Sequence, residues 1–137
     1  MAVKTVPDGR HSVTPRLFVS DAPRLVEFMK YAFGATGSYS DNTPSDIRIG
    51  DSIVMVSGTE FRAANEAYLY VYVEDADAAY RRALEKGATS VEEPSDQFYG
   101  DRRATVRDSW GNTWQIATHK EDLSLEEIQK RAAALAR

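Results

Sequence analysis

Alternating hydrophobic and polar positions define two segments that resemble each other, and each runs into an amphipathic helical pattern. Residues 17–22 read Leu-Phe-Val-Ser-Asp-Ala, and residues 71–76 read Val-Tyr-Val-Glu-Asp-Ala. Alternation with a period of two predicts strands, and apolar residues at helical spacing after them predict helices. Both predicted helices end at Gly-Ala-Thr, at residues 34–36 and 87–89. The chain therefore repeats one strand–helix unit.

Each repeat continues with alternating segments that predict a β-hairpin. Residues 47–56 hold two apolar runs on either side of Gly-Asp, and residues 104–116 hold two runs on either side of Asp-Ser-Trp-Gly-Asn. Turn residues between alternating runs are typical of hairpins. Short segments at residues 38–39 and 90–91 leave room for one further edge strand in each repeat. The sequence therefore predicts an α+β fold in which a strand–helix–strand–strand–strand unit occurs twice.

A separate helix is predicted at the end of the chain. Ser-Leu-Glu-Glu at residues 124–127 fits a capping box, and the helical pattern continues to Leu135. Its apolar positions fit packing on the domain, packing on a partner chain, or a solvated terminal helix. The predicted organisation is one domain that consists of a tail at 1–12, a first module at 13–57, a linker at 58–66, a second module at 67–118 and a C-terminal helix at 119–137.

Composition narrows the class of protein. The chain has 137 residues, of which 42% are hydrophobic, and this favours a domain with a core over a disordered chain. Its 17 basic and 21 acidic residues give a net charge of −4, which argues against nucleic acid as a partner. The absence of cysteine excludes disulfides and cysteine metal sites and favours a cytoplasmic protein. No segment is apolar enough for a signal peptide or a membrane span, so we expect no membrane partner.

Several short motifs in this order resemble one protein family. Residues 19–21 open the first predicted helix with Val-Ser-Asp, residues 33–35 close it with Phe-Gly-Ala, and residues 108–112 precede the last strand. Together with the repeat, they resemble the glyoxalase, bleomycin-resistance and extradiol-dioxygenase superfamily, also called vicinal oxygen chelate. Three further segments, at residues 99–102, 114–119 and 121–124, resemble the PhnB-like branch of this superfamily in particular.

The resemblance covers roughly residues 13–124 and carries expectations about the fold. It implies two βαβββ modules that curl into an incomplete barrel, with one cleft per curved sheet. It also implies a homodimer. We therefore expect these two modules, with the additional C-terminal helix, in a chain that pairs with a second copy.

Enzymes of this family hold a divalent metal with four side chains, mostly His and Glu, from the first and last strands of both modules. The resemblance places the corresponding positions at Thr14, Met55, Tyr68 and Gln115. Neutral oxygens, a thioether and a phenol of pKa about 10 are poor ligands for a catalytic divalent ion. We therefore expect no metal and no other cofactor.

Strand alternation gives each predicted strand one apolar face and one mixed face, and the resemblance makes the mixed face the wall of the cleft. Aromatic side chains there suit a flat, partly apolar ligand that polar groups would orient. The candidate ligand-binding residues of this face are Arg16, Phe18, Met55, Tyr68, Tyr70, Tyr72 and Gln115. Two further candidates are Arg102, as an anion-binding group, and Trp110, at a turn tip.

Each of these candidates has a simpler interpretation. The tyrosines could fill a closed barrel or a subunit contact, Arg102 could form surface ion pairs, and Trp110 could be a contact surface or fold over the cleft. His11 and His119 could act as metal ligands or as a general base, but surface positions flanking the domain are the commoner meaning. No catalytic residue is assigned.

Three functions remain compatible with the sequence. The favoured one is a metal-free binding protein, similar to bleomycin-resistance members, that sequesters a planar aromatic antibiotic or metabolite. The alternative is a lyase, isomerase or dioxygenase with an unusual metal site or with acid–base chemistry through Tyr or Arg. A structural or regulatory module with a vestigial cleft is the third. The first is favoured because the substitutions remove the Lewis acid while the face stays aromatic.

Overall fold

The computed structural model describes residues 2–60 and 62–136. The chain divides into two compact units, Met1–Ala67 and Tyr68–Arg137. Across the described residues there are two mixed sheets and three helices, and neither sheet closes into a barrel. The predicted α+β fold is confirmed. None of the described helices is long and apolar enough to cross a membrane.

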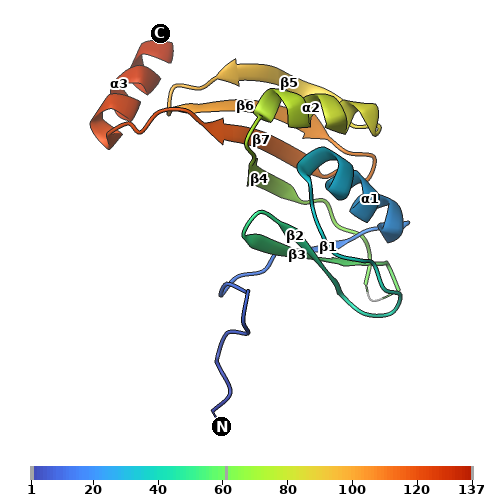
Figure 1. Ribbon diagram of the computed structural model, residues 1–137. Coiled ribbons are helices and arrows are strands. Elements are labelled where there is room, and N and C mark those ends of the chain that lie inside the picture. The colour runs from blue at the N-terminus through green and yellow to red at the C-terminus, as the bar shows by residue number, and fades with distance from the viewer. Residues whose placement is uncertain (1, 61, 137) are drawn as a thin grey trace. The chain divides into compact units, whose positions relative to one another are not determined.

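Unit 1 is a three-stranded sheet with one helix (Figure 1). Strand β3 lies in the centre, parallel to β1 and antiparallel to β2. Helix α1 packs against β3 and buries Leu25, Met29 and Ala32 completely. The elements of unit 1 are β1 (Arg16–Phe18), α1 (Ala22–Phe33), β2 (Ser45–Ile49) and β3 (Ser52–Ser57).

The edge strand expected near residues 38–39 is reduced to a single bridge between Thr36 and Arg48. The reason lies in the next residue, Gly37, whose φ of 124° is in the left-handed region. This backbone conformation turns the chain away after one pair of hydrogen bonds. A Cβ atom at Gly37 would also lie only 2.5 Å from the carbonyl oxygen of Asp46. Unit 1 is therefore a shorter version of the predicted module.

Unit 2 forms the complete strand–helix–strand–strand–strand pattern. Its sheet has the order β4-β7-β6-β5, in which β4 is parallel to β7 and the other neighbours are antiparallel. Asp75 caps the helix by accepting a hydrogen bond from the Ala78 N–H at 3.1 Å. The elements of unit 2 are β4 (Tyr68–Tyr72), α2 (Ala76–Glu85), β5 (Thr89–Asp96), β6 (Asp101–Arg107), β7 (Thr113–His119) and α3 (Leu125–Leu135).

The sheet of unit 2 has one apolar face, and α2 covers it (Figure 1). The helix packs against β5, β6 and β7, and the apolar side chains of β6 and β7 on this face are fully buried. Leu69 and Val71 point to the same side from β4 but are only half-buried. The fully buried residues of this face are Ala104, Val106, Trp114 and Ile116. The opposite face therefore carries the polar and aromatic side chains.

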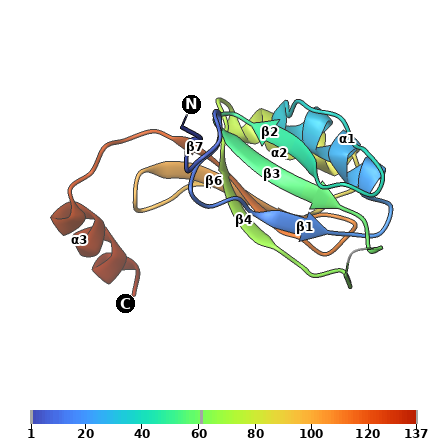
Figure 2. The same ribbon diagram turned by 90° about the horizontal axis from the view of Figure 1, so that it is seen from below.

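Helix α3 begins at the predicted cap, where the Ser124 hydroxyl accepts a hydrogen bond from the Glu127 N–H at 3.1 Å. Figure 2 shows α3 standing apart from the sheet of unit 2. None of its described residues is buried, and Leu125 and Leu135 are 69% and 70% exposed. The predicted C-terminal helix is confirmed, and in a single chain its apolar side chains are exposed or, at Ile128 and Ala132, half-buried.

The turn between β6 and β7 is organised by one buried carboxylate. Asp108, which is 5% exposed, accepts hydrogen bonds from the backbone N–H groups of Trp110 and Asn112, both at 2.9 Å. It also accepts the Asn112 side-chain amide at 3.0 Å and the Trp114 indole N–H at 2.8 Å. The Asp-Ser-Trp-Gly-Asn segment is thus a self-contained support for the last hairpin.

Replacing this carboxylate is expected to destabilise the fold. Asp108→Ala leaves four buried or half-buried donors without their acceptor, so the free energy of unfolding should fall by about 2–4 kcal/mol. Urea denaturation measures the change. Asp51→Ala is the matched control, because that turn carboxylate accepts an exposed hydrogen bond from Ser52 at 3.0 Å. Equal effects of the two substitutions would contradict a central role for Asp108.

Candidate functional site

The uncovered face of the unit 2 sheet carries a row of tyrosines. Tyr68, Tyr70 and Tyr72 alternate along β4 and are 68%, 38% and 59% exposed. The rings of Tyr70 and Tyr72 lie 5.3 Å apart between centroids at an angle of 58°. Gln115 of β7 lies directly beside Tyr70 in the strand register. The structure therefore brings four of the predicted residues together on one open face.

A buried carboxylate, which the sequence did not single out, fixes two of these rings. Asp101 opens β6, is 3% exposed and accepts hydrogen bonds from the hydroxyls of Tyr70 at 2.6 Å and Tyr72 at 2.8 Å. Its other oxygen lies 2.8 Å from Nδ1 of His119, its partner across β6 and β7. Asp101 thereby connects three strands of the sheet.

The hydrogen bonds around Tyr70 have a defined direction. The single hydroxyl hydrogen of Tyr70 is donated to Asp101, so at the 3.0 Å contact with Tyr99 the Tyr99 hydroxyl is the donor. Tyr99 in turn accepts a hydrogen bond from Nη1 of Arg103 at 2.9 Å. A chain of donors thus runs from Arg103 through Tyr99 and Tyr70 to Asp101.

Arg103 extends this network toward β5. Its Nη2 donates to Glu92 at 2.9 Å, and the Thr105 hydroxyl donates to the same carboxylate oxygen at 2.6 Å. Among the described residues, Nε of Arg103 is a buried donor that lacks a hydrogen-bond partner. The sequence pointed to the neighbouring Arg102 as the candidate, but the arginine that joins the tyrosine network is Arg103, one position later.

The environment suppresses ionisation of the tyrosines. Burial raises the pKa of Tyr70, and so do its hydrogen bonds to Asp101 and Tyr99. Burial and the bond to Asp101 also raise the pKa of Tyr72. For Asp101, burial works against the anion, but hydrogen bonds from Tyr70, His119 and Tyr72 outweigh it, and its pKa lies below the usual value. At neutral pH the site holds a carboxylate ringed by neutral phenols.

His119 is held between two carboxylates. Its Nδ1 lies 2.8 Å from Asp101 and its Nε2 lies 2.7 Å from Asp122. Both contacts raise the pKa of His119 above its ordinary 6.5, the bond to Asp101 most of all. An imidazolium with a proton on each nitrogen satisfies both acceptors. This arrangement suits a structural cation and leaves no free nitrogen to act as a general base.

The residues at the family's metal positions do not fit a metal. Thr14, Met55, Tyr68 and Gln115 supply weak neutral donors, and Tyr68 would have to lose its phenolic proton to bind an ion. Within residues 2–60 and 62–136, no group of three or more His, Asp or Glu side chains could hold a metal ion.

Two predicted residues lie away from the tyrosine row. Arg102 is on the opposite side of β6 and binds Asp77 of α2 through two hydrogen bonds, at 2.6 and 3.0 Å, and Asp96 at 3.2 Å. Its guanidinium is thus engaged in ion pairs, which was the alternative to an anion-binding role for Arg102. Trp110 is half-buried in the β6–β7 turn, at the opposite end of that hairpin from Asp101.

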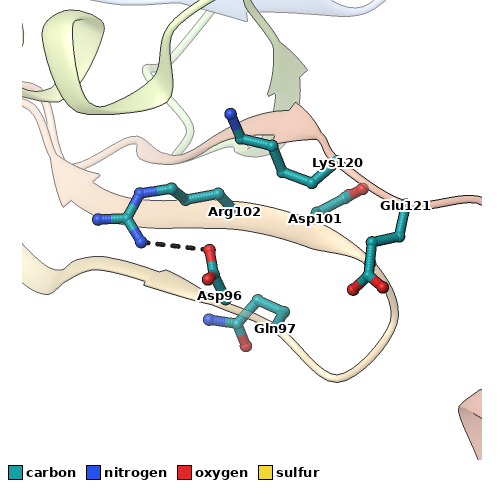
Figure 3. A pocket seen from close by; sticks show the side chains of 7 residues that line it. Asp96, Gln97, Asp101, Arg102, Lys120 and Glu121 are labelled. Carbon is teal, nitrogen blue, oxygen red and sulfur yellow. Dashed lines mark hydrogen bonds and ion pairs between the residues drawn. The ribbon is translucent and has the colours of Figure 1, made fainter.

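Arg102 also borders a pocket of about 410 Å³ in unit 2 (Figure 3). Charged side chains of both signs project around it, and the ion pair between Asp96 and Arg102 spans part of it. Such mixed charge offers no single ligand class a clear preference. The lining residues are Asp96, Gln97, Gly100, Asp101, Arg102, Lys120 and Glu121.

The remaining predicted residues gather on unit 1. Arg16 pairs with Met55 in the register of β1 and β3, and the Arg16 guanidinium lies 4.6 Å from the centroid of the Phe18 ring. Phe18 is only 7% exposed, so its ring is not an open stacking surface. The predicted site residues thus form two groups, one on each unit.

Comparison with known proteins identifies the family. The Glyoxalase/Bleomycin resistance protein/Dioxygenase superfamily matches residues 10–116 of the chain. A match over this share of the chain, together with the two mixed sheets, shows that the protein belongs to that superfamily.

Individual relatives agree with this assignment. The chain is 28% identical to an uncharacterised protein of Mycobacterium bovis over 94% of both chains. The crystal structure of TioX from Micromonospora sp. ML1 matches with a TM-score of 0.67 at 24% identity, covering 80% of this chain and 98% of that one. A glyoxalase/bleomycin resistance protein/dioxygenase family enzyme from Burkholderia phytofirmans also has a TM-score of 0.67, at 18% identity, covering 77% and 96%. These structural likenesses show a shared fold.

The contacts of His119 predict a specific pH dependence of stability. Its folded-state pKa is raised, so its contribution is fully present below pH 6.5 and is lost as the pH rises through the folded value. The contribution of Asp101, whose pKa is lowered, is present above about 3.8 and is lost as the pH falls through its folded value. His119→Gln should therefore destabilise most between these limits.

Urea denaturation of the unsubstituted protein and of His119→Gln between pH 4 and 9 measures the difference between their free energies of unfolding. A difference that grows as the solution becomes alkaline would show that the contacts do not favour the imidazolium. An NMR titration of the ring in a His11→Gln background gives the His119 pKa directly, and Asp101→Asn should lower it.

Proposed function

We propose that this protein binds a planar, partly apolar small molecule, an antibiotic or a metabolite, on the tyrosine row of unit 2 and sequesters it without a metal. The observation that carries the proposal is the row itself: Tyr68, Tyr70 and Tyr72 are exposed on one sheet face, and the last two are tied to a buried carboxylate. Exposed aromatic patches of this kind mark binding surfaces in soluble domains.

The hydrogen bonds to Asp101 preorganise the tyrosine row for ligand binding. Because Asp101 holds the hydroxyls of Tyr70 and Tyr72, their rings lose little conformational freedom when a ligand stacks on them. The hydroxyl hydrogens are committed to Asp101, while each phenolic oxygen keeps accepting capacity. The favoured guest is therefore an aromatic molecule with N–H or O–H donors on its edge, which Gln115 can also contact.

Family membership supports binding in general, since the superfamily name includes bleomycin-resistance proteins. The segment Tyr-Gly-Asp-Arg supports placement in the PhnB-like branch and contributes both Tyr99 and Asp101 to the site. The enzymatic alternative has less support. Phenols with raised pKa values are poor bases, and His119 has both nitrogens occupied. The lack of cysteine supports action in the cytoplasm.

Tyr70→Ala is expected to weaken ligand binding at least several-fold, because one aromatic pair contributes about 0.5–1.5 kcal/mol beyond area burial. Calorimetric screening of the purified protein against aromatic antibiotics and metabolites supplies the ligand. Tyr70→Phe should matter less where stacking dominates. Val71→Ala, on the other side of the same strand, is the matched control and should alter stability without altering affinity.

Two outcomes would overturn this proposal. One is a Tyr70→Ala protein that binds normally but loses several kcal/mol of stability, which would make the tyrosine a core residue. The other is ligand affinity that disappears on chelation and returns with a stoichiometric metal, which would revive the enzymatic alternative. Affinity that is equal with and without chelator is expected.

We also propose that the protein is a homodimer, since this is the usual assembly that membership of the superfamily implies. Sedimentation velocity at micromolar concentration should show a single species of twice the chain mass. A monomer under these conditions would contradict the proposal.

A further inference from the structure

Unit 1 holds two guanidinium groups on one aromatic ring. Arg16 lies 4.6 Å and Arg62 lies 5.5 Å from the centroid of Phe18. Arg62 comes from the segment after β3, and the Asn65 N–H donates to the Phe18 carbonyl at 3.2 Å, which returns that segment to β1. The ring is buried, whereas both arginines are exposed. Two cations are thus fixed at one place by contacts within a single unit.

These arginines differ from others of unit 1 in their partners. Arg10 pairs with Asp46, and Arg24 lies 3.6 Å from Asp21. By contrast, among the described residues neither Arg16 nor Arg62 forms an ion pair, and the hydrogen bond of Arg16 goes to the Ser57 hydroxyl at 3.3 Å. The charges of Arg16 and Arg62 are therefore left without a carboxylate.

Two acidic residues near these arginines, Asp46 on the sheet and Glu60 in the chain, do not pair with them. Asp46 shares the face of Arg16, but Met55 stands between them in the strand register and Asp46 pairs with Arg10. Glu60 turns its carboxylate over Gly58. Like charges near one another are unfavourable unless something compensates them, and the negative face of the ring supplies only part of that compensation.

We propose that Arg16 and Arg62 bind the carboxylate or phosphate group of a small molecule. Guanidinium groups match such oxyanions with paired N–H donors. The buried Ser57 hydroxyl accepts from Arg16 and helps to hold its guanidinium in place. Phe18 acts as the platform that holds both cations in place. The site is made by unit 1 alone, so it does not depend on the proposed function of the tyrosine row.

The experiment is an NMR titration that follows the arginine Nε–H signals of the full chain. Benzoate and phenyl phosphate are the probes, and neutral benzamide is their control. Both anions should shift the signals of Arg16 and Arg62, while benzamide should not. Arg16→Gln and Arg62→Gln should each weaken anion binding at least about fivefold, since charged hydrogen bonds are being removed.

Two further variants separate an organised site from general attraction of anions. Arg24→Gln removes the same charge from unit 1 at an ion-paired position and should leave the affinity unchanged. Phe18→Leu keeps both charges but removes the ring, and should weaken binding several-fold in a protein whose amide spectrum shows it to be folded. Equal losses for Arg24→Gln and Arg16→Gln, or equal affinity for benzamide and benzoate, would overturn the proposal.

The same titration on Tyr70→Ala distinguishes this proposal from the previous one. Shifts of Arg16 and Arg62 that persist in Tyr70→Ala support an anion site carried by unit 1. Loss of those shifts in Tyr70→Ala, with the fold intact, would overturn the assignment of the site to unit 1 alone.

Discussion

The burial of one carboxylate, Asp101, constrains the whole polar face of unit 2. An ionised group removed from water is tolerated only where donors replace the lost hydration, and removing one partner of a buried charge commonly costs about 3–5 kcal/mol. Asp101 meets this requirement with two tyrosine hydroxyls and one imidazole. Because these donors come from β4 and β7 and the acceptor from β6, the need to satisfy one charge fixes three strands against one another.

The same requirement determines what chemistry the face can perform. A tyrosine that donates to a carboxylate is held neutral, and contacts with two carboxylates raise the pKa of the imidazole and so favour its protonated form. In each group the environment favours the form that is a poor base. What remains is a rigid aromatic surface with accepting oxygens, which supports the proposed binding function.

Much of this arrangement follows from the sequence, and the missing part is a matter of pairing between distant strands. Alternation along β4 correctly separates the tyrosines from Leu69 and Val71. It cannot show that Tyr70 meets Asp101, because they are 31 residues apart and their contact depends on the order β4-β7-β6. The choice between Arg102 and Arg103 has the same origin, since one step along β6 moves a side chain from the helix side to the tyrosine side.

The polar faces of the two units differ in how far their charges are compensated. In unit 2 a buried anion is fully compensated by donors of its own chain, so that network needs no ligand to be stable. In unit 1 two exposed cations share one ring, only one of them also donates to a hydroxyl, and solvent screens the charge that the protein does not neutralise. A ligand gains most where compensation is incomplete, because an anion placed there relieves a repulsion that already exists. The proposed recognition of charge therefore lies in unit 1, and the proposed stacking surface lies in unit 2.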